Sequence, residues 1–329
     1  MKFFLFIILV ISTYAVNNKT SEWHSVYSQL KQSDLSKVDP YVEEYKGIDP
    51  LVRYPIKKRS AGSVYLMDNL RVSRMIEEGI SKKNKIKYGR EIKWTSAMID
   101  VSKLKRVSVV LTKSQINLGI IKPKTGHAQM LFEFEHGGVV TNEGFIDTLV
   151  ISYEGKRRDD QPFNPAVGLF RVYPSIFVMG TFEDLLVKVN SFFNGMEIYD
   201  LELSEKQKRD LLENYLTAAF DTETLKKERY HTTRNSCVTN MFKLLNTVLP
   251  KERKVKEWYQ AFGLYPARTL GSILPERMEG TLRKLDMVSM TTDIFGKEKI
   301  REYYFGLVEV QKRYSKSTRI FNLMYENKK

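Results

Sequence analysis

The chain contains little cysteine and little histidine. One cysteine, Cys237, and four histidines occur among 329 residues. A single cysteine excludes an intramolecular disulfide and a zinc site built from cysteines. The sequence also lacks H-E-x-x-H, G-x-S-x-G and a phosphate-binding glycine loop, the motifs of zinc proteases, serine hydrolases and nucleotide-binding enzymes. We therefore expect neither a metal nor a cofactor.

Long apolar runs are absent beyond the first residues. Lys2 precedes an unbroken apolar run from Phe3 to Ile11, followed by Thr13-Tyr14-Ala15 at the position that a signal peptidase reads. The run is shorter than the ~20 residues that span a bilayer. We expect a cleaved signal peptide over 1–15 and a periplasmic protein, with a retained N-terminal anchor as the alternative.

Acidic residues are fewer than basic ones, and the formal net charge is +14. Outside the cytosol, anionic phospholipid headgroups are the polyanion within reach, whereas nucleic acid is not. Local excess occurs at Lys57-Lys58-Arg59, over 82–87 and in the last 80 residues. The charge predicts an anionic membrane surface as a partner and no nucleic acid. The plainer interpretation is a solvated surface with scattered lysines.

The apolar pattern predicts an antiparallel sheet followed by helices, an α+β fold. Apolar and polar residues alternate cleanly over 127–135, as in a strand with two different faces. The other predicted strands are 106–112, 148–154 and 168–180. Helices are predicted after Thr181 and Ser204, each with capping-box spacing, and from Cys237 to the residue before Pro250.

The regions on either side of this core have a different character. Residues 16–105 are predicted to be mainly helical, with one helix from Asp68 to Glu78. We expect four parts: a signal peptide at 1–15, the helical region at 16–105, a core at 106–250 and a basic C-terminal extension at 251–329.

Cys237 is predicted to start a helix, because Asn235 and Ser236 are favourable N-cap residues. A helix N-terminus carries partial positive charge and free backbone N–H groups, and both lower the pKa of a thiol. A base within reach would make such a thiolate a nucleophile. The alternative is a buried structural cysteine that packs as a small apolar residue.

Among the histidines, His127 is the best candidate base. It opens the predicted strand directly after Gly126, on the face that carries polar side chains, and a sheet packed against the Cys237 helix would bring it to the sulfur. His136 stands at the other end of the strand, and His231 lies in the loop before the helix. Four carboxylates of the core, Glu133, Glu135, Asp147 and Glu154, form no recognisable pair for acid–base catalysis.

The order of these segments resembles a known family. "GHAQMLFEF", a sheet region, "YPSIFVMGTFEDLLVKVNSF", "IYDLELSEKQKRDLLENYL" and "YHTTRNSCVTNMFKLL" follow one another over about 120–250. This series resembles the periplasmic domain of the Lnb family, bacterial lipoprotein N-acyltransferases. The order of histidine strand and cysteine helix is also similar to circularly permuted papain-like (NlpC-like) enzymes, including lipid acyltransferases.

The resemblance implies roles for particular residues. It makes Cys237 the nucleophile and His127 the general base, with Tyr230 and Asn235 framing the cysteine motif. It also implies a phospholipid acyl donor and a lipoprotein or other amine as acceptor. The reaction would be acyl transfer or hydrolysis through a thioester on the cysteine.

A third residue is expected to orient the imidazole, and His136, Asn142 and Asp147 are the candidates. Two other functions stay open. One is a papain-like amidase or peptidase that cleaves cell-wall peptides with the same thiol. The other is a non-catalytic periplasmic binding or envelope protein in which Cys237 is only packing.

Overall fold

The computed structural model describes residues 53–80, 86–115, 124–141, 144–156, 170–232, 234–255 and 275–309. The chain divides into two compact units, Met1–Lys46 and Gly47–Lys329, and every described residue belongs to the second. The predicted signal peptide at 1–15 and the end of the basic extension lie outside the described residues.

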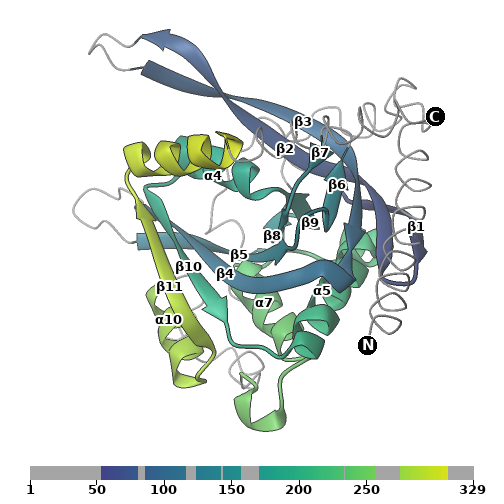
Figure 1. The fold of residues 1–329 in the computed structure, drawn as a ribbon. Helices are drawn as coiled ribbons and strands as arrows, with labels where there is room; N and C mark the ends of the chain where they lie inside the picture. The colour runs from purple at the N-terminus through teal and green to yellow at the C-terminus, as the bar shows by residue number, and fades with distance from the viewer. Residues whose placement is uncertain are drawn as a thin grey trace, which may run out of the picture. The chain divides into compact units, whose positions relative to one another are not determined.

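The described residues form one sheet of eleven strands (Figure 1). In chain order the strands are β1 (Ile56–Ala61), β2 (Val64–Ile80), β3 (Ile86–Asp100), β4 (Leu104–Gln115), β5 (Lys124–Phe134), β6 (Val139–Thr141), β7 (Gly144–Phe145), β8 (Thr148–Gly155), β9 (Ser175–Gly180), β10 (Gly195–Leu201) and β11 (Val288–Phe295). Their spatial order is β11-β10-β4-β5-β8-β9-β2-β3-β6-β7, with β1 paired to β2. Neighbours are antiparallel except β2 and β9, which meet in parallel at Arg71 and Gly180.

Helices follow the strands of the central sheet. They are α4 (Phe182–Phe192), α5 (Glu205–Phe220), α6 (Thr222–Lys227), α7 (Cys237–Leu245) and α10 (Pro275–Lys284), with a further helix over 297–309. Short 3-10 turns lie at η1 (Val101–Lys103) and η2 (Lys251–Arg253). No helix of the described residues is long and apolar enough to pass through a bilayer.

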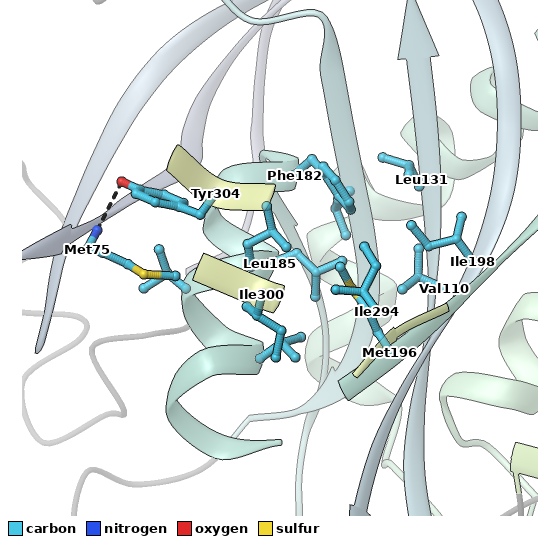
Figure 2. Close-up of a cluster of buried hydrophobic side chains, with 14 residues drawn as sticks. Met75, Val110, Leu131, Phe182, Leu185, Met196, Ile198, Ile294, Ile300 and Tyr304 are labelled. Carbon is cyan, nitrogen blue, oxygen red and sulfur yellow. Dashed lines mark hydrogen bonds between the residues drawn. The ribbon is translucent and has the colours of Figure 1, made fainter. Parts of the chain in front are cut away.

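One face of the sheet packs against α4. Val110, Leu131 and Val150, from β4, β5 and β8, are buried with the α4 side chains Leu185 and Leu186. The C-terminal part of the chain completes this cluster with Ile294, Ile300 and Tyr304, as Figure 2 shows. The Tyr304 hydroxyl accepts a hydrogen bond from the backbone N–H of Met75 at 3.0 Å, which ties the last described helix to β2 (Figure 2).

The opposite face packs against α5 and α7. Phe132 of β5 and Phe177 of β9 both meet the ring of Tyr215 on α5 edge-on, at 5.7 and 6.2 Å between centroids. Phe132 follows Leu131 directly, so successive residues of β5 contact different helices. Both faces of β5 are thus covered, which is why Gln129 is buried on the side predicted to be polar.

The predicted core elements are confirmed. β4 and β8 contain the predicted strands 106–112 and 148–154, and β5 covers 127–135 except its last residue. The strand predicted over 168–180 is shorter, since β9 begins only at Ser175 and the described residues before it form a turn. α4, α5 and α7 begin where their capping residues indicated. The helical segment that begins at Cys237 ends at Leu245, four residues earlier than predicted, in a turn before Pro250. The α+β class with an antiparallel sheet against helices is therefore established for the described residues.

The helix predicted from Asp68 to Glu78 is wrong, because this segment lies in strand β2. Arg71, Ser73 and Met75 are buried in alternation, as a strand requires, but two of the three are polar. The buried side chains of Arg71 and Ser73 both donate hydrogen bonds to the carboxylate of Asp184 on α4, more than a hundred residues away in the chain. The described part of the region predicted to be helical, 53–105, is mostly β-sheet.

The expected domain boundaries at 105 and 250 remain predictions. The sheet continues across both positions, since β1–β3 precede the first and β11 follows the second. Ile294 and Ile300 are fully buried in the α4 cluster. The described part of the C-terminal segment therefore belongs to the same hydrophobic core as β4, β5 and β8.

Candidate active site

The only cysteine of the chain is the first residue of α7, and it is buried. Ser236 caps the helix: its hydroxyl accepts from the backbone N–H of Thr239, while the Thr239 hydroxyl accepts from the N–H of Ser236 at 2.7 Å. This reciprocal bonding holds the first turn in place. The sulfur therefore lies at the positive end of the helix, where a thiolate is favoured.

The sulfur meets the sheet where two strands separate. β5 and β8 are paired only from Met130 and Ile151 to Glu133 and Thr148. Beyond Met130 the backbone of β5 has no β8 partner on this side, and the N–H of Ala128 donates to the sulfur instead. α7 packs against both strands next to this opening (Figure 1).

His127 precedes Ala128 and is hydrogen-bonded to the Cys237 sulfur. Burial raises the pKa of the thiol, but the charge of His127 and the N–H groups of Ala128 and Val238 outweigh burial and lower it. Burial lowers the pKa of His127, but the Cys237 thiolate and Glu154 outweigh it and raise this pKa to about 9. Both shifts favour a thiolate–imidazolium pair over a neutral thiol and imidazole.

A serine and a glutamate stand behind the imidazole. His127 Nε2 lies 2.5 Å from the Ser152 hydroxyl, which donates to Glu154 Oε1 at 2.9 Å. The direct distance from Nε2 to Glu154 Oε1 is 3.6 Å. Since Nε2 faces β8, Nδ1 is the nitrogen left for the sulfur. The hydroxyl thus bridges the imidazole and the carboxylate.

Lys188 of α4 completes the row of charges. Its ammonium donates to Glu154 Oε1 at 2.7 Å, and both side chains are largely buried. Burial raises the pKa of Glu154, but Lys188, His127 and Arg71 outweigh burial and hold this pKa well below its usual range. Thiolate, imidazolium, carboxylate and ammonium therefore alternate in sign across the sheet from α7 to α4.

Tyr230 contacts the other side of the cysteine. Its buried hydroxyl accepts from the backbone N–H of Cys237 and donates to the sulfur. Burial, followed by the charge of the thiolate, raises the pKa of Tyr230 well above its usual value, so the hydroxyl keeps its proton. Gly155 lies beside Tyr173 and Tyr230: a Cβ there would make a tight contact of 3.0 Å with Tyr173 and an ordinary one of 3.4 Å with the Tyr230 ring.

Asn235 holds the loop that leads to the cysteine. Its amide nitrogen donates to the Tyr153 hydroxyl at 2.7 Å and to the carbonyl of Arg229 at 3.0 Å, and its amide oxygen accepts from Asn240 at 2.8 Å. These contacts fix the turn between Tyr230 and α7. Asn235 therefore shapes the backbone around the sulfur.

Two of the three residues expected behind the imidazole lie elsewhere. His136 follows the far end of β5, roughly 30 Å along the strand from His127. Its Nδ1 lies 3.2 Å from Asp147, and both side chains are partly exposed. Asn142 is outside the described residues. Among the residues the structure describes, no three His, Cys, Asp or Glu side chains gather so that they could hold a metal ion.

The sequence reading missed Ser152, Glu154 and Lys188 as site residues. A signal for each exists in hindsight. Ser152 and Glu154 are polar residues two apart in an otherwise apolar strand, so they share a face. Lys188 is the one lysine of α4, next to the buried residues Val187 and Val189. Polar residues in such positions need partners, which the sequence does not identify.

Fold and site together define a class of protein: an α+β protein with a buried cysteine at a helix N-terminus, paired with a histidine of the adjoining strand. The family model of the Lnb N-terminal periplasmic domain matches residues 93–275, which are 183 of the 329 residues. The chain therefore belongs to this family. Neither the curated proteins nor the solved structures contain a match to it.

Proposed function

We propose that this chain is an exported acyltransferase or acyl hydrolase that removes acyl chains from lipid esters with the Cys237 thiolate. The observation that carries the proposal is the buried Cys237–His127 pair, in which the pKa of the thiol is lowered and that of the imidazole is raised. Membership in the Lnb family supports a periplasmic location and acyl chemistry. The order of histidine strand and cysteine helix supports a permuted papain-like arrangement.

In the first half of the reaction the thiolate attacks the carbonyl carbon of the ester. The negative charge moves to the carbonyl oxygen, and the donors around the sulfur, the N–H groups at the start of α7 and the Tyr230 hydroxyl, are the groups proposed to stabilise it. The carbon–oxygen bond of the ester then breaks. His127 gives its Nδ1 proton to the departing alkoxide, which leaves as the lysophospholipid alcohol, and the acyl chain stays on the sulfur as a thioester.

In the second half an amine or water attacks the thioester. The neutral imidazole of His127 takes the proton of the attacking group, and the carbon–sulfur bond breaks. The products are an amide or a fatty acid, the Cys237 thiolate and the His127 imidazolium, as at the start. A lipoprotein N-terminus is the proposed amine, and water gives the hydrolase reaction.

Glu154 serves this cycle as a positioning residue. It acts through Ser152, whose hydroxyl joins its carboxylate to His127 Nε2. This contact keeps Nδ1 directed at the sulfur and stabilises the imidazolium. Lys188 keeps the carboxylate ionised. The proposed third residue is therefore Glu154, in place of His136, Asn142 or Asp147.

The test is the mass of the intact protein after incubation with phospholipid vesicles and no amine acceptor. We expect an increase of one acyl chain that hydroxylamine removes, since a thioester is labile to it. Cys237→Ala should show no increase, and His127→Ala should acylate at least ~10²-fold more slowly.

His136→Ala is the matched control, because it removes a histidine of the same strand region that pairs with Asp147 at the surface. It should acylate at the wild-type rate. Cleavage of a cell-wall peptide without any acyl adduct from phospholipid would favour the amidase alternative and contradict the proposal. An unmodified wild type without activity on either substrate would favour a structural cysteine.

A further inference from the structure

A short apolar tip stands exposed next to the candidate active site. Phe170 is 78% exposed and Val172 is 51% exposed, although side chains of this kind are usually buried. Between them, Arg171 has a φ of 56°, a left-handed conformation that residues other than glycine seldom adopt. The chain therefore turns sharply at Arg171 and presents both apolar side chains to solvent.

The backbone joins this tip to the cysteine. Tyr173, the next residue after Val172, accepts a hydrogen bond from the N–H of Tyr230 at 2.8 Å, and Pro174 forms a β-bridge with Arg229. Tyr230 is the residue whose hydroxyl contacts Cys237. The last tip residue, Val172, is therefore followed directly by Tyr173, which is hydrogen-bonded to the residue that contacts the sulfur.

Arginines occur in the tip and in the segment paired with it: Arg171 lies between Phe170 and Val172, and Arg229 bridges Pro174. Arg229 and Arg234 are exposed, and the N–H of Arg234 donates to the carbonyl of His231 at 3.2 Å. Burial and the charges of Arg171 and Arg234 lower the pKa of His231. The nearby carboxylate of Glu228 accepts from the Tyr153 hydroxyl at 3.2 Å. The surroundings of the two apolar side chains are therefore cationic.

We infer that this tip, formed by Phe170 and Val172 with Arg171, Arg229 and Arg234, docks the protein on an anionic phospholipid surface. The apolar side chains enter the headgroup region and the arginines bind lipid phosphates, the combination by which peripheral proteins adhere to membranes. The net charge of +14 favours the same partner. The docking brings Cys237 to the acyl esters of the proposed substrate, and in this respect it rests on the proposed function.

The experiment is flotation of the full chain with vesicles of phosphatidylcholine alone or mixed with phosphatidylglycerol. We expect binding to the anionic vesicles, weakened by salt because the arginines contribute. The variant Phe170→Ser with Val172→Ser should bind them about tenfold more weakly, because it loses the apolar contribution. The variant Arg171→Gln with Arg234→Gln should bind more weakly and lose most of the salt dependence.

Phe192→Ser is the matched control. Phe192 is a phenylalanine exposed to 56% at the end of α4, with the guanidinium of Arg90 5.0 Å from its ring. This variant should bind like the wild type. Equal binding by the wild type and both tip variants, or no binding of the wild type to anionic vesicles, would overturn the inference. The wild type could instead fail to bind vesicles and form a dimer that the tip variants abolish and Phe192→Ser does not. That result would identify a second copy of the chain as the partner of the tip.

Docking and catalysis can fail separately. A short-chain ester in free solution should acylate Cys237 equally fast in the wild type and in the Phe170→Ser/Val172→Ser variant, whereas vesicle lipid should acylate the variant more slowly. Binding that depends on the tip without any acyl adduct would keep the docking surface and reject the acyl chemistry. Acylation from vesicles at equal rates in both proteins would reject the docking surface and keep the chemistry.

Discussion

At the scale of single residues, the protonation of His127 depends on the groups around it. The Cys237 thiolate and Glu154 both favour the imidazolium and outweigh burial, so the pKa is raised to about 9. Glu154 reaches the ring through Ser152, and its own pKa is held well below the usual range by Lys188 and His127. The carboxylate is therefore ionised over the whole range in which His127 titrates.

This arrangement predicts the effect of Glu154→Gln on the histidine. Removing the carboxylate removes an anion that stabilises the imidazolium, so the pKa of His127 should fall from about 9, while the thiolate still opposes the effect of burial. NMR titration of the imidazole C–H signals measures this directly. The chain has four histidines, and the His127→Gln spectrum identifies the relevant signal.

Asp147→Asn is the matched control for this titration. Asp147 immediately precedes β8, and its carboxylate contacts His136 and Gly137 of the turn after β5. The variant should leave the His127 titration unchanged. A shift of His127 in Asp147→Asn, or none in Glu154→Gln, would contradict the assignment of Glu154 as the positioning residue.

The sequence allowed Cys237 and His127 to be predicted as the pair because each has a local signal. Cys237 follows two capping residues, and His127 opens an alternating strand. Glu154 has no such signal, since its role depends on β8 lying beside β5 and on α4 supplying Lys188. Which carboxylate serves a histidine is decided by strand neighbours, which local patterns do not contain.

At the scale of elements, the first turn of α7 positions the sulfur. The capping box of Ser236 and Thr239 holds the helix start beside the opening between β5 and β8. Loss of the cap allows the first turn to fray, and the partial charge of the helix end then acts less on the thiol. The strength of the cap and the reactivity of the thiol should therefore change together.

Ser236→Ala tests this connection. The variant should lower the free energy of unfolding by about 1 kcal/mol, the usual contribution of a serine N-cap, and should slow alkylation of Cys237 at neutral pH. Ser204→Ala removes an equivalent capping box, formed with Gln207 at the start of α5. It should cost about the same free energy in urea unfolding and leave the alkylation rate unchanged. Equal alkylation rates in the two variants would show that the N-cap of α7 does not affect the reactivity of the Cys237 thiol.

Elements whose patterns are local were predictable, and those set by distant partners were not. The capping boxes and apolar faces of α5 and α7 are visible in the sequence, and both helices begin where predicted. β2 was mistaken for a helix because its buried positions include Arg71 and Ser73. Asp184 of α4 binds both and stabilises their burial.

At the scale of the whole molecule, the sheet connects segments from the entire described chain. β9, β2, β3, β6 and β7 on one side and β10 and β11 on the other extend the sheet beyond β4, β5 and β8 (Figure 1). The family match, 93–275, does not include β11 or the helix over 297–309, yet Ile294 and Ile300 are fully buried against α4. The α4 helix that carries Lys188 is therefore supported by residues beyond the matched region.

Folding also creates the candidate active site, since His127 and Cys237 are 110 residues apart in the chain and touch only through the packing of α7 on β5. The thiol is therefore expected to be activated in the folded protein and ordinary in the unfolded chain. A transferase, a hydrolase and an amidase would all need this activated thiol, whereas a structural cysteine would not have one.

The most direct test is the rate of alkylation of Cys237 by iodoacetamide as a function of pH, for the wild type, for His127→Ala and for the wild type unfolded in urea. We predict fast alkylation of the folded wild type with a midpoint well below ~8.5, the pKa of a free cysteine. In His127→Ala and in urea the midpoint should move up toward that value. Slow alkylation of the folded protein at every pH, with reaction only after unfolding, would contradict the account and leave Cys237 as a buried structural residue.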